Sequence, residues 1–173
     1  PDTAQFLKVS ATLLSNVVMN VQSAQYAAGY ETTIRSLAFR DYATGLPNQY
    51  PYESDLSDAV IEAQTAGVPA HAVSICLDGL DAIRNVHGMI KAGLVVKAVA
   101  DEVGKMLEEM PEKHAVLYRV AGSVFTVIVQ PGAAEEVQVF ARKVAEKGLA
   151  PWKVDGADYA CRPKVAGVPC GVN

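Results

Sequence analysis

Apolar side chains recur at helical spacing through the first 39 residues. Residues 3–39 contain no proline and a single glycine, Gly29, and their apolar positions fit the a/d seam of a heptad pattern. We therefore expect one long helix over residues 1–39, whose apolar face carries Leu7, Leu14, Val18 and Val21. A face this broad packs equally well on its own domain or on a second copy of the chain. Both readings stay open, and a homodimer through this helix is the preferred one.

Helical and strand-like patterns alternate after residue 40. Helical periodicity predicts helices at residues 54–66, 82–110 and 133–147, and β-propensity predicts strands at residues 71–77, 115–120, 125–130, 152–154 and 159–170. Gly67, Pro111 and Gly148 give the three helices ordinary stop signals. Gly122 lies in the connection of a central hairpin, where we expect it to supply a positive φ. Residues 40–173 thus predict an α/β (α+β) domain with an antiparallel-containing central sheet covered by helices.

Composition excludes several classes of partner. The 173 residues are 50% hydrophobic and 20% charged, with a net charge of -4 and no run of basic residues, so we expect neither nucleic acid nor anionic lipid as a partner. Cys76, Cys161 and Cys170 are widely spaced, which indicates no disulfide framework or zinc site and favours a reducing cytoplasm. The apolar stretch at residues 6–21 is too polar for direct membrane insertion.

Three segments together resemble the GGDEF domain, the diguanylate cyclase family. Residues 41–48, Asp-Tyr-Ala-Thr-Gly-Leu-Pro-Asn, resemble its D-x-L-T-G-L-P-N opening, and residues 75–85 resemble its L-D-L-D-G-F-K-x-I-N-D segment. Residues 119–125, Arg-Val-Ala-Gly-Ser-Val-Phe, resemble its active-site turn without the acids. The segments occur in the family's order over about residues 38–171. The resemblance implies the family's palm-like fold, preceded by a signalling helix. The family usually continues past Val168 into a last helix and strand, whereas this sequence stops at Asn173.

The same resemblance places the family's metal ligands on residues that cannot replace them. The family joins two GTP molecules into cyclic di-GMP with divalent metal, whose ligands are the first Asp of the second segment and acids in the hairpin turn. These positions are Cys76, Ser123 and Val124 here, which are poor ligands for magnesium or none at all. Asp78 matches the family's second Asp, and we expect it to serve as a cap or hydrogen-bond acceptor. The other residues of the turn motif are Ala121, Gly122 and Phe125.

The nucleotide contacts implied by the resemblance are altered as well. Asp81 stands at the phosphate-contacting Lys, Arg84 at the guanine-binding Asn, and Gly93 at an Asp that contacts the base. Asn85 is a polar helix residue that could still reach a base edge. The family's product-inhibition motif falls on Glu112 and Ala115 and is absent.

Two further residues of the motifs have structural expectations. We expect Asp41 to order the turn at residues 41–48 and Arg119 to be a solvated strand residue. His71, His87 and His114 lack ligand spacing and are interpreted as ordinary core or surface histidines.

The sequence favours a catalytically inactive GGDEF-like regulatory or protein-interaction domain of a bacterial cyclic di-GMP signalling protein, with no cofactor. Its expected partners are other domains of the same or a partner signalling protein, and a second copy of itself. One alternative is a GTP sensor that controls a neighbouring phosphodiesterase domain. A cyclase that is active with unusual ligands is the weakest hypothesis.

Overall fold

The computed structural model describes residue 19 and residues 38–110, 115–132 and 134–172. Contacts divide the chain into Pro1–Ala38 and Phe39–Asn173, and all helices and strands given below belong to the second unit. Leu7, Leu14, Val18 and Val21 lie outside the described residues, so the expected apolar helix and its packing stay a prediction. Among the described residues, no helix is both long and apolar enough to cross a bilayer.

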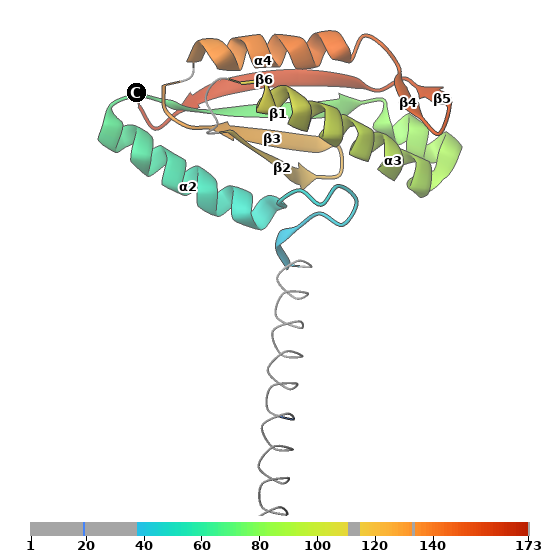
Figure 1. Ribbon diagram of the computed structural model, residues 1–173, viewed down its shortest axis with the longest axis horizontal. Helices are drawn as coiled ribbons and strands as arrows, with labels where there is room; N and C mark the ends of the chain where they lie inside the picture. The colour runs from blue at the N-terminus through green and yellow to red at the C-terminus, as the bar shows by residue number, and fades with distance from the viewer. Residues whose placement is uncertain (1–18, 20–37, 111–114, 133, 173) are drawn as a thin grey trace, which may run out of the picture. The chain divides into compact units, whose positions relative to one another are not determined.

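A four-stranded sheet forms the centre of the domain (Figure 1). Its order is β2-β3-β1-β6, and every neighbouring pair is antiparallel. The strands are β1 (Ala70–Asp78), β2 (Ala115–Ala121), β3 (Val124–Val129) and β6 (Arg162–Cys170). The predicted antiparallel sheet and the central hairpin are therefore confirmed.

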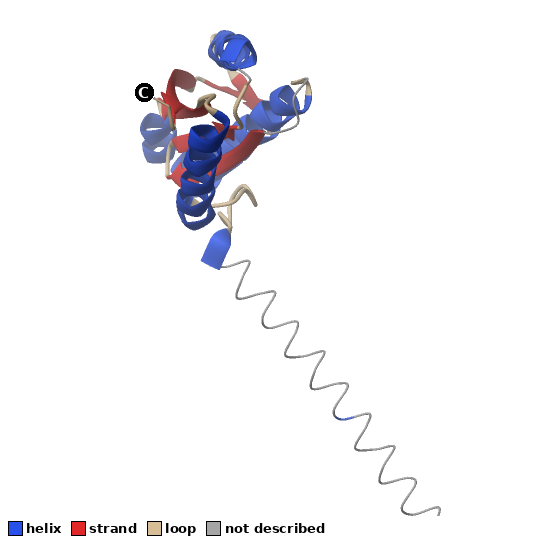
Figure 2. Ribbon diagram, turned by 90° about the vertical axis from the view of Figure 1, so that its left-hand side faces the viewer, coloured by secondary structure: helices blue, strands red, loops and turns tan. Residues whose placement is uncertain are grey.

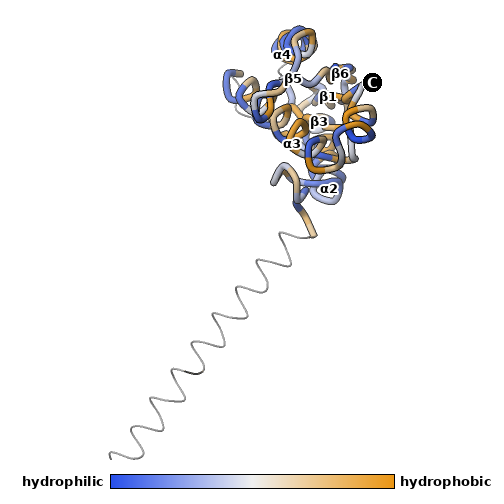
Figure 3. Tube along the Cα trace, turned by 90° about the vertical axis from the view of Figure 1, so that its right-hand side faces the viewer, coloured by the Kyte–Doolittle hydropathy of each residue, from blue (hydrophilic) through white to orange (hydrophobic). Residues whose placement is uncertain are grey.

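Alternating side chains of the strands build two apolar layers, because successive residues of a strand face opposite sides of the sheet. On one side, strand residues such as Val73, Ile75 and Phe125 pack with the helices α3 (Leu80–Glu108) and α4 (Ala134–Lys147). On the other side, α2 (Gln49–Ala66) packs over Tyr118 and Ile128. Figure 2 shows helices on both sides of the strands, and Figure 3 shows hydrophobic and hydrophilic stretches alternating along α4.

Helix α2 begins at Gln49, earlier than the expected start at residue 54. Asn48 caps it, because its side chain accepts a hydrogen bond from the backbone N–H of Tyr50 at 3.0 Å. Pro51 lies in the first turn, where a missing N–H costs nothing. The helix ends at Gly67, whose φ of 68° gives the left-handed conformation of the expected stop.

Helix α3 is not the continuous helix that the apolar periodicity predicts. Gly88 has φ 84° and ψ 171°, a conformation outside the helical region that only glycine adopts readily. The element therefore breaks between His87 and Met89. The long second part, from Met89 to Glu108, carries the buried face with Val95, Val96 and Val99.

The C-terminal strands also differ from expectation. Tyr159 does not begin the last strand but belongs to β5 (Ala157–Tyr159), which pairs with β4 (Trp152–Val154) around a turn at Asp155 and Gly156. The indole N–H of Trp152 donates to the backbone carbonyl of Cys161 at 2.7 Å. This contact holds the chain where it leaves the small hairpin, and β6 starts at Arg162.

Candidate functional site

The end of β1 and the β2–β3 turn bring together the positions that the sequence singles out. Cys76 lies directly opposite Val124 in the antiparallel register, and the backbone N–H of Leu77 donates to the carbonyl of Ser123 at 2.8 Å. The Cys76 side chain is exposed. Cys76, Ser123 and Val124 therefore meet at one end of the sheet, where β1 ends and β3 begins.

The turn itself forms without the positive φ expected at Gly122. Gly122 is absent from the positive-φ glycines of the domain, so that expectation is wrong. A register shift between Arg119 and Ala121 supplies the local bend instead. Ala121 is exposed at the turn, and Phe125 is fully buried in the core. Phe125 therefore stabilises the fold and does not face the site.

The carboxylate of Asp78 is held by a strand neighbour. Lys164 Nζ lies 2.9 Å from Asp78 Oδ2, and Asp78 faces Arg162 in the register of β1 and β6. The hydrogen bond from Lys164, reinforced by its charge, lowers the pKa of Asp78. Gly79 is the N-cap of α3, with no side-chain capping bond. Asp78 is thus a hydrogen-bond acceptor, as expected, but it does not cap the helix.

These residues do not fit a magnesium ion. Magnesium takes hard oxygen ligands. This end of the sheet offers the thiol of Cys76, the aliphatic side chain of Val124 and the carboxylate of Asp78, which is already paired with the ammonium group of Lys164. Among the described residues, no group of three or more His, Cys, Asp or Glu side chains could hold a metal ion.

Asp81 and Arg84 form an ion pair on the first part of α3. Arg84 Nη1 lies 3.0 Å from Asp81 Oδ1, and both side chains are accessible to solvent. Arg84 also reaches the hairpin, because a Cβ added to Gly122 would lie 4.0 Å from Arg84 Nη2. Asn85 is exposed beside them. The structure therefore brings Asp81, Arg84 and the turn together, with the charge of Arg84 balanced locally.

The loop at residues 41–48 is ordered by Asp41, as expected. Asp41 Oδ1 accepts hydrogen bonds from the backbone N–H of Thr44 at 2.9 Å and from Thr44 Oγ1 at 2.7 Å. Arg119 joins this loop to the hairpin, with Nη1 at 3.0 Å from Asp41 Oδ1 and Nη2 at 2.6 Å from the carbonyl of Gly122. The expectation that Arg119 is solvated is wrong, because its side chain is 11% exposed.

A cavity of about 360 Å³ lies between this loop, the hairpin turn and α3. Tyr42, Tyr50 and Met89 contribute apolar surface to it, and Arg84 and Arg119 contribute cationic groups. Its position beside Gly122 makes it the concave part of the candidate site.

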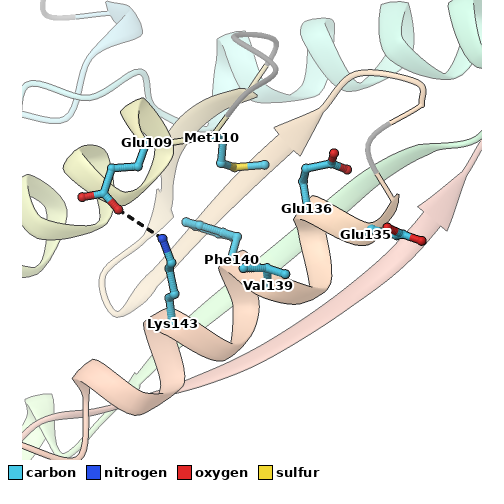
Figure 4. Close-up of a pocket in the computed structure, with 7 residues that line it drawn as sticks. All are labelled: Glu109, Met110, Glu135, Glu136, Val139, Phe140 and Lys143. Atoms are coloured by element: carbon cyan, nitrogen blue, oxygen red, sulfur yellow. Dashed lines mark hydrogen bonds and ion pairs between the residues drawn. The ribbon is translucent and has the colours of Figure 1, made fainter.

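A second cavity of about 280 Å³ lies between the end of α3 and α4 (Figure 4). Met110 and Phe140 form its apolar floor, and its lining includes three glutamates against one lysine, Lys143. Lys143 Nζ is paired with Glu109 at 3.1 Å. The acidic lining does not favour an anionic ligand.

The structure describes one of the two positions on which the family's product-inhibition motif falls. Glu112 lies outside the described residues, and Ala115 begins β2.

Comparison with known proteins decides the family. The family described as "Diguanylate cyclase, GGDEF domain" matches residues 38–165. The chain belongs to the GGDEF family. No curated protein matches it significantly.

Solved GGDEF structures show the same fold. The FimX GGDEF domain from Pseudomonas aeruginosa has a TM-score of 0.64 and 21% identity, over 76% of this chain and 80% of that one. The coiled coil and GGDEF domain of DgcB from Caulobacter crescentus, in complex with c-di-GMP, has a TM-score of 0.71 and 17% identity, over 90% and 81%. The diguanylate cyclase SiaD from Pseudomonas aeruginosa, in complex with its activator SiaC, has a TM-score of 0.65 and 16% identity, over 97% and 66%.

Two residues of the GGDEF site were missed by reasoning from the sequence. Lys164 and Arg162 lie opposite Cys76 and Asp78 in the register of β6. Because Arg162 and Lys164 are two residues apart on β6, both side chains lie on the same face of the sheet. Neither residue belongs to a motif, so only the strand register shows that they lie beside Asp78 and Cys76.

Proposed function

We propose that this GGDEF domain is catalytically inactive and serves as a regulatory or protein-interaction module of a cyclic di-GMP signalling protein. One observation carries the proposal. Cys76 and Val124 are paired in the register of β1 and β3 at one end of the sheet, and the carboxylate there, Asp78, is held by Lys164 at 2.9 Å.

The chemistry of the family explains why this arrangement matters. Metal-dependent phosphoryl transfer uses the ions to stabilise charge that develops on the phosphates. A neutral thiol and a valine cannot hold such an ion, and the ammonium group of Lys164 competes for Asp78. The loss of such electrostatic stabilisation costs several kcal/mol of barrier, on the order of a hundredfold or more in rate for each contact.

The nucleotide side of the site supports the same conclusion. Asp81 stands where the family has a cation for the phosphates, and it is 81% exposed, so it presents a negative charge at that position. Arg84 is paired with it at 3.0 Å. The pair leaves no net positive charge for a triphosphate at this end of α3.

The test is a cyclase assay on the purified chain with GTP and magnesium or manganese, with SiaD as the active reference. We expect no cyclic di-GMP above background. Product that increases in proportion to the amount of this chain, and that disappears with the Cys76→Ala variant, would overturn the proposal.

A GTP-sensing function is the second candidate, and the cavity of about 360 Å³ beside Arg84 and Arg119 favours it. Calorimetric titration with GTP, with and without magnesium, separates it from the first. We expect weak or absent binding, and Asp81→Lys improves affinity if the cavity accepts the nucleotide. A submillimolar dissociation constant for the unmodified chain would replace the first candidate with the second.

Partners and location are part of the same proposal. The structure of SiaD contains its activator SiaC, and the structure of DgcB contains a coiled coil together with the GGDEF domain. These neighbours support regulation of this chain through bound partners and through its N-terminal residues. We expect the chain to be cytoplasmic and to form a homodimer through residues 3–39. Sedimentation of the intact chain tests the dimer, and a monomer at all concentrations would contradict it.

A further inference from the structure

The cavity between the end of α3 and α4 lies outside the candidate site and has an apolar floor (Figure 4). Met110 and Phe140, which are 8% and 1% exposed, form this floor, and Val139, which is 51% exposed, extends the apolar surface toward solvent. The volume of about 280 Å³ lies just below the range of roughly 300–1,000 Å³ that is typical of sites for whole small molecules. The cavity is therefore sized for one large side chain.

Carboxylates dominate the lining of this cavity. Glu109, Glu135 and Glu136 stand against one cation, Lys143, whose Nζ is already paired with Glu109 at 3.1 Å. Within residues 38–110, 115–132 and 134–172, neither Glu135 nor Glu136 has an ion pair. Two carboxylates therefore remain uncompensated beside the apolar floor.

Neighbouring groups do not neutralise these two carboxylates. Lys105 Nζ, at 3.7 Å, and Lys147 Nζ, at 3.1 Å, both pair with Glu102 instead. Because α3 ends and α4 begins at the cavity, the negative partial charge of one helix end and the positive partial charge of the other offset each other. The side chains therefore decide the sign of the potential, and it is negative.

The charged and apolar parts of the lining lie side by side. In Figure 4, Lys143 lies to one side of Met110 and Phe140, and Glu135 and Glu136 lie to the other. A ligand that matches this arrangement has an apolar stem and a cationic tip. An arginine side chain has both, because its stem packs on apolar surface and its planar guanidinium group presents a fork of N–H donors to carboxylates. Arginine is also enriched among the residues that anchor protein interfaces in pockets.

We propose that this cavity binds an arginine side chain of a partner protein, with the guanidinium group at Glu135 and Glu136 and the stem on Met110 and Phe140. Apolar residues flank the arginine in the partner's segment, and one of them contacts Val139. This rests on the proposed function as an interaction module and names the chemistry of the partner. The same carboxylates disfavour a polyanion such as a nucleotide at this place.

Nuclear magnetic resonance titration of the intact ¹⁵N-labelled chain tests the proposal. The probe is the peptide acetyl-Leu-Arg-Leu-amide, and the matched control is the same peptide with citrulline, which has nearly the shape of arginine without its charge. We expect saturable shifts of the backbone amides at Glu109, Glu136, Val139 and Phe140. The citrulline peptide binds about tenfold more weakly or less, because it lacks the charge-assisted hydrogen bonds.

Substitutions on α4 connect this binding to the cavity. Glu135→Gln combined with Glu136→Gln removes both uncompensated charges and lowers the affinity for the arginine peptide about fivefold or more. Glu146→Gln changes an exposed glutamate of the same helix that does not line the cavity, and it leaves the affinity unchanged. The spectrum of each variant shows directly that it is folded.

Four results would each overturn the proposal: no saturable shifts with the arginine peptide, shifts confined to other parts of the chain, equal affinity for the citrulline peptide, or an equal loss of affinity in the double variant and in Glu146→Gln. The cyclase assay is independent of these outcomes, so the two proposals fail separately.

Discussion

Two Asp–Arg pairs with the same separation show how differently two neighbouring regions of the domain are built. Asp41–Arg119 and Asp81–Arg84 both have an N–O distance of 3.0 Å. The first joins the loop at residues 41–48 to the hairpin, with side chains only 17% and 11% exposed. The second lies on the surface of α3, where Asp81 is largely in water.

The residues that order the loop are therefore distinct from those at the positions where the resemblance implies metal ligands. In the loop, one carboxylate accepts from Thr44 and Arg119 together, and Arg119 also holds the carbonyl of Gly122. At the end of β1 and in the β2–β3 turn, the positions at which the resemblance implies metal ligands hold Cys76, Ser123 and Val124, and β1 pairs with β3 in a regular antiparallel register. We therefore expect an ordered loop beside a site that holds no metal ion.

The largest predicted effect is the loss of the loop pair. Arg119→Ala leaves the poorly exposed carboxylate of Asp41 without its cation, which we expect to lower the free energy of unfolding by about 2 to 4 kcal/mol. Arg84→Ala is the matched control, and removal of that exposed pair costs about 0.5 kcal/mol or less. Urea denaturation measures both. Equal costs would contradict the distinction between the two regions.

The second prediction compares two cysteines at the same end of the sheet. Cys76 is exposed, whereas Cys161 is buried and its pKa is raised to about 11, chiefly by burial and then by the charge of Asp78. Each pKa unit is a tenfold change in thiolate fraction, so Cys161 reacts at least about 100-fold more slowly than an ordinary exposed thiol. Labelling with a chromogenic disulfide at pH 8, in a Cys170→Ser background, follows both. Labelling rates of Cys76 and Cys161 that lie within a factor of three of each other would contradict the burial of Cys161.

The third prediction concerns the α2 face of the sheet, which extends the retained scaffold. The hydroxyl of Tyr118 donates to Asp55 at 2.6 Å, and its burial, followed by this hydrogen bond, raises the pKa of Tyr118 above its usual range. Tyr118→Phe removes the bond and lowers the free energy of unfolding by about 1 to 2 kcal/mol. Tyr50→Phe, at an exposed tyrosine, is the control and leaves stability unchanged. An unchanged midpoint for Tyr118→Phe would argue against this contact.

The smallest effect is expected at the ion pair between Asp78 and Lys164, beside Cys76. The pKa of Asp78 is lowered and that of Lys164 is raised, each by the hydrogen bond between them and then by the partner's charge. Asp78 contributes to the free energy of unfolding above the pKa of an unfolded aspartate, and this contribution is lost as pH falls through its lowered folded-state pKa. Lys164 contributes to the free energy of unfolding below the pKa of an unfolded lysine, and this contribution is lost as pH rises through its raised folded-state pKa.

Because both groups are exposed, the midpoints of Lys164→Met and the unmodified chain differ only slightly at pH 7. The difference disappears at strongly acidic and strongly alkaline pH. Urea midpoints measured across pH decide this. A large difference at pH 7 would show that the pair is structural rather than a surface contact.

Much of the fold was predictable because it rests on local patterns. The strand β1, the central hairpin and the stop at Gly67 follow from apolar runs and turn residues. The break at Gly88 was not, because the apolar periodicity continues across it and a glycine inside a helical pattern is usually tolerated. The separate β5 was missed for another reason, since it depends on the pairing of Tyr159 with Trp152.

The candidate site divides in the same way. Motif positions predicted that Cys76, Ser123 and Val124 lie together, and the register of β1 and β3 agrees. The partners of Asp78 and Arg119 could not be predicted, because Lys164 and Asp41 are far from them in sequence and meet them only through tertiary structure.

Manganese binding distinguishes an intact metal site from the one that we propose, in which the end of β1 holds no metal ion although the loop and the hairpin beside it are ordered. Electron paramagnetic resonance of Mn²⁺, titrated into the intact chain without GTP, which would itself bind the ion, reports the free ion. We predict that the signal of the free ion persists at every ratio of metal to protein. Saturable loss of that signal at one ion per chain, abolished in the Cys76→Ala or Asp78→Asn variant, would contradict it.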